Sequence, residues 1–427
     1  MNSRRLTRKA FLVSAIAAAA AMALLTSAST AFAQAGTPIK IGSIKTLEGT
    51  FATGGQDAVR ALTMAFEEVN YTVAGRKIEW IRESSNAQAD VALARARKLI
   101  EQDGVNLIIG PLSGAEGIAL RDYSRTLKGK TIINGQSAAA DTTMRDPSPN
   151  FFRFNGDGMQ WIAGLGNYTY NTLKARHVAV VAGDYAFPYT QVFGFMQEFC
   201  KAGGKVTKLW SPLGTADFAS TIARIPKTAD AVPVLHGGTD ALAFLTQYAQ
   251  AGATLPLIAG SVTADQVVMS ARGPHRRLLN GLITAGPLVD DSDNPTWVAF
   301  VDRYRKRFPD GFAAPSINAV HYYIAAKATL QALEQVKGDL SNDQKAFQAA
   351  LAKVVVSTPM GGSVRLDENR QAIADNFIRR VVERDGKLFT TQVQKFEAVT
   401  QTQGMPRDQF LALGSPSRDN PSCPPAN

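Results

Sequence analysis

The chain has 427 residues, of which 45% are hydrophobic and 19% are charged. This length exceeds what one compact core usually supports, and the apolar content suffices for two packed lobes, so a single small domain and a mostly disordered chain are excluded. Lysine and arginine outnumber the acids by 46 to 36, but the first 33 residues hold four bases and no acid, which leaves an excess of six beyond Ala33.

The N-terminus predicts a secretory signal peptide over residues 1–33. A basic cluster precedes an apolar run at 10–25, and small residues end in Ala31-Phe32-Ala33. The run is shorter than the roughly 20 residues of a membrane span, and no cysteine near the cleavage site could carry a lipid. We therefore expect cleavage before Gln34 and a free periplasmic protein. The segment 7–12 is similar to a twin-arginine signal with one Arg replaced by Lys, so the Sec and twin-arginine routes both stay open.

Two cysteines remain in a chain sent to an oxidising compartment, Cys200 and Cys423. A disulfide between them would fix the Pro-rich tail to the second half of the chain. The alternative is two unpaired thiols, one at a helix end and one in a mobile tail. Spacing alone does not decide between these interpretations.

From residue 38, short β-branched segments alternate with amphipathic helices. Ala58, Leu62, Ala65, Phe66 and Val69, for example, share one face of a helix. This order predicts an α/β fold with a parallel sheet covered on both faces. The first series has expected strands at 38–44, 78–81, 105–109 and 131–133, with helices around 58–69, 91–102 and after 111.

A second α/β series follows residue 154, and then a mainly helical stretch at 295–354. A hairpin is expected at 376–383 and 388–396, joined through Asp385-Gly386. The tail from Gln401 is rich in turn residues and is predicted to be irregular. The second series has expected strands at 177–182, 205–210, 231–235 and 255–259, with helices ending near 200, around 218 and at 239–250.

The sequence contains no complete signature of an enzyme, a metal site or a nucleic-acid-binding protein. Gly129-Lys130-Thr131 lacks the earlier glycine of a phosphate-binding loop, and the segment 135–139 is one glycine short of a nucleophile elbow. The four histidines are too far apart in sequence to form a known ligand pair. Basic residues are scattered on helix faces without interleaved aromatics. We predict no catalytic activity, no cofactor, no metal and no nucleic-acid partner.

Polar turns follow four predicted strands, at the edge where open α/β sheets bind ligands. The turn at 110–114 places a hydroxyl and free N–H groups at a helix start, which suits a carboxylate. Aromatic residues in the turn at 184–189 could cover an apolar ligand body. Any one of these turns could be an ordinary helix cap, but together they favour one shared cleft. The other two turns are at 46–51 and 134–138.

These turns, taken in order, resemble the leucine/isoleucine/valine-binding family of periplasmic solute receptors over residues 38–397. The resemblance also rests on the segments at 152–154, 236–240 and 358–362. It implies two Rossmann-like lobes joined by three crossings, near Phe154, Ile283 and Gly361. The implied division is 34–154 plus 284–360 for lobe 1, 155–283 plus 361–400 for lobe 2, and a tail at 401–427.

The resemblance also implies the site. Ser113 and the pair Ser137-Ala138 fall where the family grips a ligand carboxylate, and 237–240 and 263–265 fall on second-lobe turns that read the amino end. Phe187-Pro188 replaces the family's common Tyr-Gly, and neither Asp240 nor Asp265 aligns securely with an ammonium-binding acid. The expected ligand-binding residues are Glu48, Phe51, Ser113, Gly114, Gln136, Ser137, Ala138, Tyr185, Phe187, Gly237, Thr239, Asp240, Thr263 and Asp265.

The function implied by the resemblance is capture of a small carboxylate ligand, a branched-chain amino acid or an aromatic acid, by hinge closure. The expected partners are this ligand and the permease subunits of an ABC importer, and the receptor is expected to be monomeric. Two alternatives stay open from the sequence: a ligand-sensing receptor domain of the same fold, and an exported hydrolase.

Overall fold

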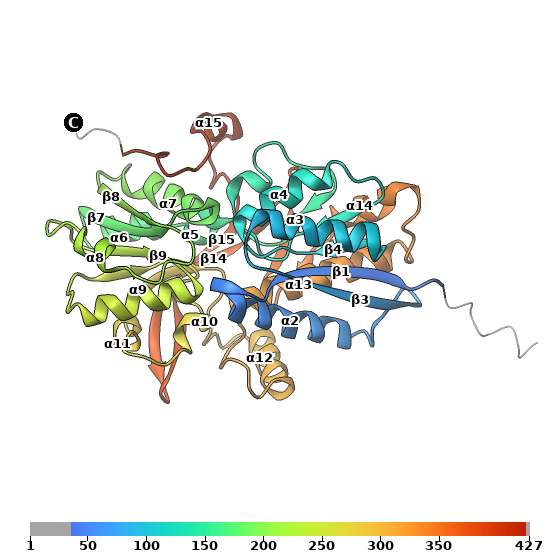
Figure 1. Ribbon diagram of the computed structural model, residues 1–427, viewed down its shortest axis with the longest axis horizontal. Helices are drawn as coiled ribbons and strands as arrows, with labels where there is room; N and C mark the ends of the chain where they lie inside the picture. Colours follow the sequence, from blue (N-terminus) through green and yellow to red (C-terminus); the bar gives the residue numbers. More distant parts are fainter. Residues whose placement is uncertain (1–35, 424–427) are drawn as a thin grey trace, which may run out of the picture.

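Two β-sheets, each with helices packed on its faces, organise the chain into two lobes side by side (Figure 1). The computed structural model describes residues 36–423, and the predicted signal peptide lies outside these residues. Within 36–423, no helix has both the length and the apolar composition needed to cross a bilayer.

The first sheet has the strand order β2-β3-β1-β4-β5-β6 and is parallel except for the β2–β3 pair. Its central strands are almost wholly buried because helices cover both faces, which explains their near-continuous isoleucine and leucine composition. The strands are β1 Ile39–Thr46, β2 Thr72–Val73, β3 Arg76–Ser85, β4 Leu107–Ile109, β5 Thr131–Ile133 and β6 Phe151–Phe152.

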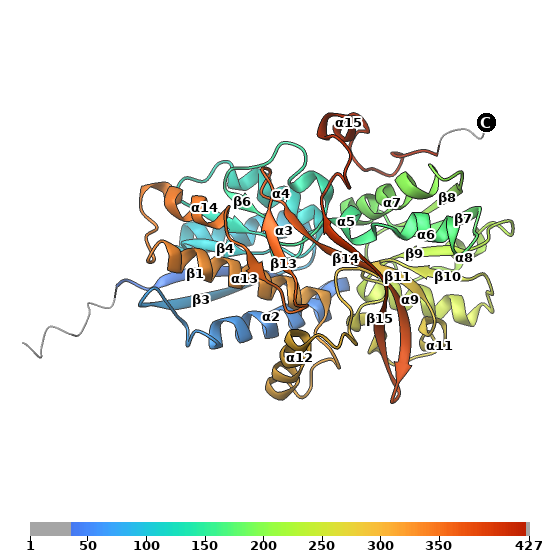
Figure 2. The same cartoon turned by 180° about the vertical axis from the view of Figure 1, so that it is seen from behind.

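Helices from two distant parts of the chain cover this sheet (Figure 2). Helix α13 from the later part packs along α2 from the beginning, and α13 is buried on nearly every side. The early elements are η1 Gly49–Phe51, α2 Ala52–Glu67, α3 Ala89–Arg97, η2 Lys98–Gln102, α4 Gly114–Ser124 and η3 Ala140–Thr142, and the later ones are α12 Pro295–Arg307, α13 Ile317–Gln335, η4 Asn342–Gln344 and α14 Lys345–Leu351.

The second sheet has the order β12-β13-β14-β11-β10-β9-β7-β8, and β15 pairs with β14 as the predicted hairpin. The strands are β7 His177–Gly183, β8 Lys205–Ser211, β9 Val232–Leu235, β10 Leu257–Ala259, β11 Ile283–Gly286, β12 Val356–Ser357, β13 Ser363–Leu366, β14 Ala372–Arg384 and β15 Lys387–Val399. The helices are α5 Gly158–Ile162, α6 Leu165–Asn171, α7 Ala186–Phe199, α8 Ala219–Ala223, α9 Gly238–Gln250, α10 Gln266–Met269 and α11 Arg276–Leu279.

The chain passes between the two lobes after β6, after β11 and between β12 and β14. Strand β11 pairs with β10 and β14, and β12 pairs with β13. Residues 284–286 and 356–357 therefore belong to the second sheet, whereas the predicted lobe limits assign them to lobe 1. The division into lobes is otherwise kept as a prediction.

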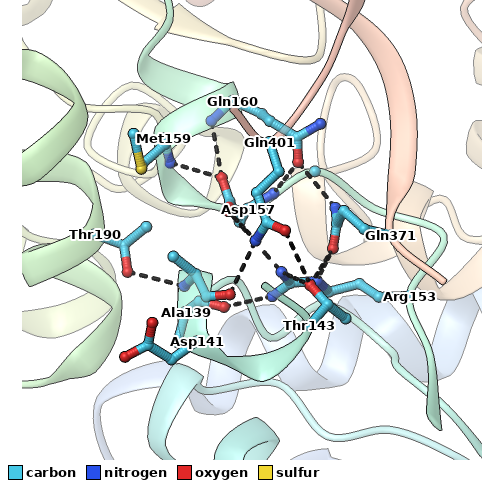
Figure 3. Close-up of polar contacts among 12 residues, drawn as sticks. Ala139, Asp141, Thr143, Arg153, Asp157, Met159, Gln160, Thr190, Gln371 and Gln401 are labelled. Carbon is cyan, nitrogen blue, oxygen red and sulfur yellow. Dashed lines mark hydrogen bonds and ion pairs between the residues drawn. The ribbon is translucent and has the colours of Figure 1, made fainter. Parts of the chain in front are cut away.

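A buried polar network holds the first and third crossings together (Figure 3). The guanidinium of Arg153 donates to the side chain of Gln371, to the Ala139 carbonyl at 2.6 Å and to the Thr143 hydroxyl at 2.6 Å. Asp157 accepts from the side chain of Gln401 at 2.6 Å. Because these groups are fully buried and mutually satisfied, the network fixes where the strands emerge from the lobes.

The C-terminal tail is tied to the second lobe. Cys200 at the end of α7 and Cys423 form a disulfide, with their Cα atoms 5.2 Å apart, which confirms the predicted pair. The prediction of an irregular tail is wrong at one place, because Arg407–Ala412 forms the short helix α15. Phe410 of this helix packs against Phe193 of α7, so an apolar contact that the turn-rich sequence conceals orders the segment.

Candidate ligand-binding cleft

A small cavity lies between the lobes where the carboxyl ends of strands from both sheets face each other. Its volume is about 40 Å³. Nine of the predicted ligand-binding residues line it: Phe51, Ser113, Gly114, Gln136, Ala138, Tyr185, Phe187, Gly237 and Asp265. The polar turns of the two α/β series therefore converge on one site.

Five predicted residues do not reach the cavity wall, each for a local reason. Glu48 and Thr239 are exposed. The Ser137 hydroxyl donates to Asn134 at 2.7 Å, and the Thr263 hydroxyl donates to the Val234 carbonyl at 2.7 Å. Asp240 accepts from the backbone N–H of Gly214 at 2.9 Å.

Ser113 caps helix α4 and lines the cavity at the same time. Its hydroxyl donates to the Ala87 carbonyl at 2.9 Å and accepts from the Glu116 amide at 3.4 Å. Glu116 completes a capping box by accepting from the Ser113 amide at 2.8 Å, and burial raises the pKa of this carboxyl. The Ser113 hydroxyl is therefore already engaged. The group available to a ligand at this place is the N-terminus of α4, where free N–H groups favour an anion.

Gln136 has an unpaired polar atom and lines the cavity. Its backbone amide donates to the Pro111 carbonyl at 3.0 Å, which fixes the turn. Its side-chain oxygen Oε1 is buried and has no partner within the described residues. A buried acceptor of this kind is unfavourable until a donor reaches it, so Gln136 is suited to a polar ligand group.

Asp265 is the one charged side chain among the residues that line this cavity in the described structure. It follows β10, caps α10, and accepts from the Ile317 backbone N–H of the other lobe at 2.9 Å. Burial chiefly, with smaller contributions from the nearby Asp290 and Asp57, raises the pKa of Asp265 to about 7.

The lobes touch across the cleft. Besides the Asp265–Ile317 bond, the Thr50 hydroxyl donates to Asp240 at 3.2 Å, and the Ala140 amide donates to the Thr190 hydroxyl at 3.1 Å. These contacts describe a closed state around a small space.

Two glycines permit this approach of the lobes. A Cβ on Gly114 would lie 3.0 Å from the Phe187 backbone nitrogen, on the opposite lobe. A Cβ on Gly238 would lie 2.1 Å from the Thr50 carbonyl oxygen. At Gly238 this distance excludes a side chain unless the backbone of the opposite lobe moves. At Gly114 the contact is tighter than most Cβ contacts, so a side chain there requires a small shift of the opposite lobe.

Sequence reasoning missed part of the wall. Trp161 of α5 stacks on His321 of α13, with ring centroids 5.0 Å apart, and meets Phe187 edge-on at 5.7 Å. It lies outside every strand-end turn, so the rule that ligands bind at strand ends does not point to it. The other residues missed are Gly54, Leu112, Gly238, Val262, Val267 and Asn318. Gly238 lies within the turn already singled out at 236–240, whereas α13 supplies Asn318.

The fold and the cleft together define the class of protein: a two-lobed receptor that closes on a small ligand. A family model described as periplasmic binding protein matches residues 38–387, and the chain belongs to this family. It is a solute-binding protein of ABC transport and not an enzyme, as the resemblance in sequence implied.

Similar proteins agree with this assignment. The Leu/Ile/Val-binding protein homolog 8 of Brucella suis is 27% identical over 377 residues, covering 85% of this chain and 92% of that protein. An ABC transporter substrate-binding protein from Sphaerobacter thermophilus is 29% identical, with a TM-score of 0.75 and coverage of 84% and 98%. A Rhodopseudomonas palustris solute-binding protein in complex with 3,4-dihydroxybenzoic acid is 25% identical, with a TM-score of 0.78 and coverage of 86% and 98%.

Proposed function

We propose that the protein is the periplasmic receptor of an ABC importer and that its cleft captures an apolar amino acid as a zwitterion. The observation that carries this proposal is the pairing of a helix start with one carboxylate on the same cavity wall. The N-terminus of α4 at Gly114 suits the ligand carboxylate, and Asp265 suits its ammonium group.

Charge balance favours an amino acid over a simple acid. No lysine or arginine lines the described cavity, and Asp265 is its one charged group. A lone carboxylate would share the cavity with Asp265 without a cation, unless Asp265 took up a proton. A zwitterion offers an ammonium to Asp265 and a carboxylate to the helix start, so both ligand charges have a partner.

The cavity walls fit an apolar side chain. Phe51 and Tyr185 approach each other across the cleft with ring centroids 6.4 Å apart, and Phe187 packs edge-on against Trp161. The volume of about 40 Å³ is far below the several hundred cubic ångströms typical of small-molecule pockets. The ligand therefore enters when the lobes separate, and the bound state is wider than the closed state described above.

A second ligand class, aromatic acids, is favoured by the four aromatic rings and by the raised pKa of Asp265. A protonated Asp265 could donate to an aromatic carboxylate rather than repel it. The similarity to the Rhodopseudomonas palustris protein that holds 3,4-dihydroxybenzoic acid also supports this class.

Calorimetric titration separates the two classes. The ligands are leucine, 4-methylpentanoate, which is leucine without its ammonium, leucinamide, and benzoate. We expect leucine to bind and the other three to bind at least tenfold more weakly. Asp265→Asn should weaken leucine binding by about tenfold or more, since a charge-assisted hydrogen bond contributes about 1.5–3 kcal/mol, and should leave 4-methylpentanoate no weaker. Benzoate binding that is tighter than leucine binding, and that Asp265→Asn retains, would replace the amino-acid assignment with the second class.

We propose further that residues 1–33 direct export and are removed before Gln34, that the mature protein is a free monomer, and that it delivers its ligand to permease subunits in the inner membrane. The family and the composition of the N-terminus support this. N-terminal sequencing of the protein from a periplasmic extract tests the cleavage, and light scattering of the purified protein tests the monomer. Intact Met1 or a lipid-modified chain would contradict the proposal.

A further inference from the structure

A second and larger cavity lies beside the three crossings between the lobes. Its volume is about 300 Å³, and Trp161 separates it from the cleft, because this residue lines both. All three crossings contribute to its wall, through the segments 154–156, 287–294 and 358–364 together with the start of β14. We call it the hinge cavity.

The hinge cavity contains buried polar atoms without partners. Trp161 Nε1, His321 Nδ1 and Asn376 Oδ1 have no hydrogen bond within the described residues. Their residues are 2%, 5% and 1% exposed, so bulk water does not satisfy these atoms from outside. Since nearly all buried polar groups in folded proteins are paired, three unpaired atoms on residues that line one cavity indicate a place for a polar ligand.

The interior of the hinge cavity is uncharged. Burial lowers the pKa of His321 to about 3, so its ring is neutral at physiological pH. The charged residues of the wall are Asp293, Asp375 and Lys395, and the last two pair with each other at 3.0 Å. Asp293 and Lys395 are exposed and Asp375 is half-buried. An ionised ligand group placed deep in the cavity would therefore find no opposite charge there.

The remaining wall mixes apolar, aromatic and uncharged polar side chains. It presents the stacked pair of Trp161 and His321. Its apolar side chains include Phe154, Leu288, Val320, Ile324 and Phe377, and its uncharged polar side chains are Asn155, Gln160, Ser292, Asn294, Thr358, Ser363 and Gln392. A cavity of about 300 Å³ is at the lower end of the range for small-molecule sites. These dimensions and surfaces suit a single compact ring.

We propose that the hinge cavity is a second binding site, for a compact uncharged ring compound that carries an amide or hydroxyl group. An amide oxygen accepts from Trp161 Nε1, and its N–H groups donate to Asn376 Oδ1 and His321 Nδ1. The site is distinct from the cleft and does not depend on which ligand the cleft takes. Because all three crossings line the hinge cavity, occupancy there is coupled to movement of the lobes.

Benzamide is the probe, and benzoate and benzylamine are its charged counterparts with the same ring. Calorimetric titration of the mature protein should show benzamide binding, with benzoate and benzylamine at least tenfold weaker at this site. Ala374→Trp fills the hinge cavity from the half-buried wall of β14. Asn376→Leu keeps the number and branching of the side-chain heavy atoms but removes the acceptor. Each should weaken benzamide at least tenfold.

Two matched variants show which cavity the probe occupies. Gln136→Leu alters the cleft only, and Val393→Trp adds an indole to an exposed position on β15 that does not line the hinge cavity. Both should bind benzamide like the wild type. No binding to the wild type would overturn the proposal, and so would binding that Gln136→Leu removes while Ala374→Trp and Asn376→Leu retain it. Leucine titrations on the same variants test the cleft separately, so failure at one site is distinguishable from failure at the other.

Discussion

Removing the charge of Asp265 should change how the stability of the ligand-free protein depends on pH. The carboxyl lies between the lobes, accepts from the Ile317 amide, and has a pKa raised from 3.8 to about 7, chiefly by burial. A raised pKa in the folded state means that the folded protein holds the proton more tightly than the unfolded chain. Asp265 therefore costs no stability at low pH, and stability is lost as the pH rises from about 4 to about 7.

The magnitude follows from the shift. About three pKa units at 1.36 kcal/mol each give an upper bound of roughly 4 kcal/mol for the free energy of unfolding that is lost above about pH 7. Asparagine in place of Asp265 keeps an oxygen for the Ile317 amide but loses the acceptor for the Val267 amide, at 3.4 Å from Oδ2. Loss of this cap costs about 1 kcal/mol at every pH. The Asp265→Asn variant should thus be slightly less stable near pH 4 and up to about 3 kcal/mol more stable near pH 8.

Urea unfolding of both proteins at intervals between about pH 5 and about pH 8 measures this difference. Other titrating groups are shared by the two proteins and cancel in the difference, which should change by about 1.4 kcal/mol per pH unit up to about pH 7 and then level off. Asp385→Asn at the exposed hairpin tip controls for the loss of one negative charge. A difference that stays constant with pH would refute the argument that Asp265 is buried and protonated in the closed state.

Three other variants test the closed cleft and the tail. Gly114→Val should force the lobes apart at Phe187, raise the radius of gyration in small-angle scattering and weaken the cleft ligand at least tenfold, and an unchanged radius would contradict closure as described. Gln136→Leu should leave the urea midpoint unchanged or raise it, because the substitution removes an unpaired buried acceptor. The same variant should bind the cleft ligand about tenfold more weakly, and an unchanged affinity would exclude Gln136 from ligand binding. Cys423→Ser opens a loop of 223 residues and should lower the free energy of unfolding by up to about 5 kcal/mol in the chain-entropy model, whereas an unchanged urea midpoint would show that the tail adds nothing.

The sequence predicts most strands of both sheets because parallel strands buried on two faces need continuous apolar runs. The segments at 131–133 and 177–182 coincide with β5 and nearly with β7 for this reason. The place of α13 in the first lobe was available through the resemblance, which assigns residues 284–360 to that lobe, rather than through periodicity. The helix α13 has apolar residues on nearly every side, so its pattern does not indicate which sheet it covers.

The site is predicted less completely because a turn shows where the backbone goes but not which atoms remain free. Ser113 and Thr263 were both expected among the ligand-binding residues, yet the described structure commits both hydroxyls to backbone partners within their own lobes. Among the predicted residues that line the cavity, Gln136 is the one whose side-chain oxygen is buried without a partner. Such competition between local and ligand hydrogen bonds is decided only by the three-dimensional arrangement.

Trp161 lies between the two cavities and lines both, yet no pattern in the sequence predicts its role. Its indole ring is part of the wall of both cavities, and the indole Nε1 has no hydrogen-bond partner within the described residues. Stacking on His321 and the edge-on contact with Phe187 connect α5 to α13 and α7, which belong to different lobes. A change in lobe angle must therefore repack these rings, and any ligand that contacts them in either cavity alters the free energy of closure.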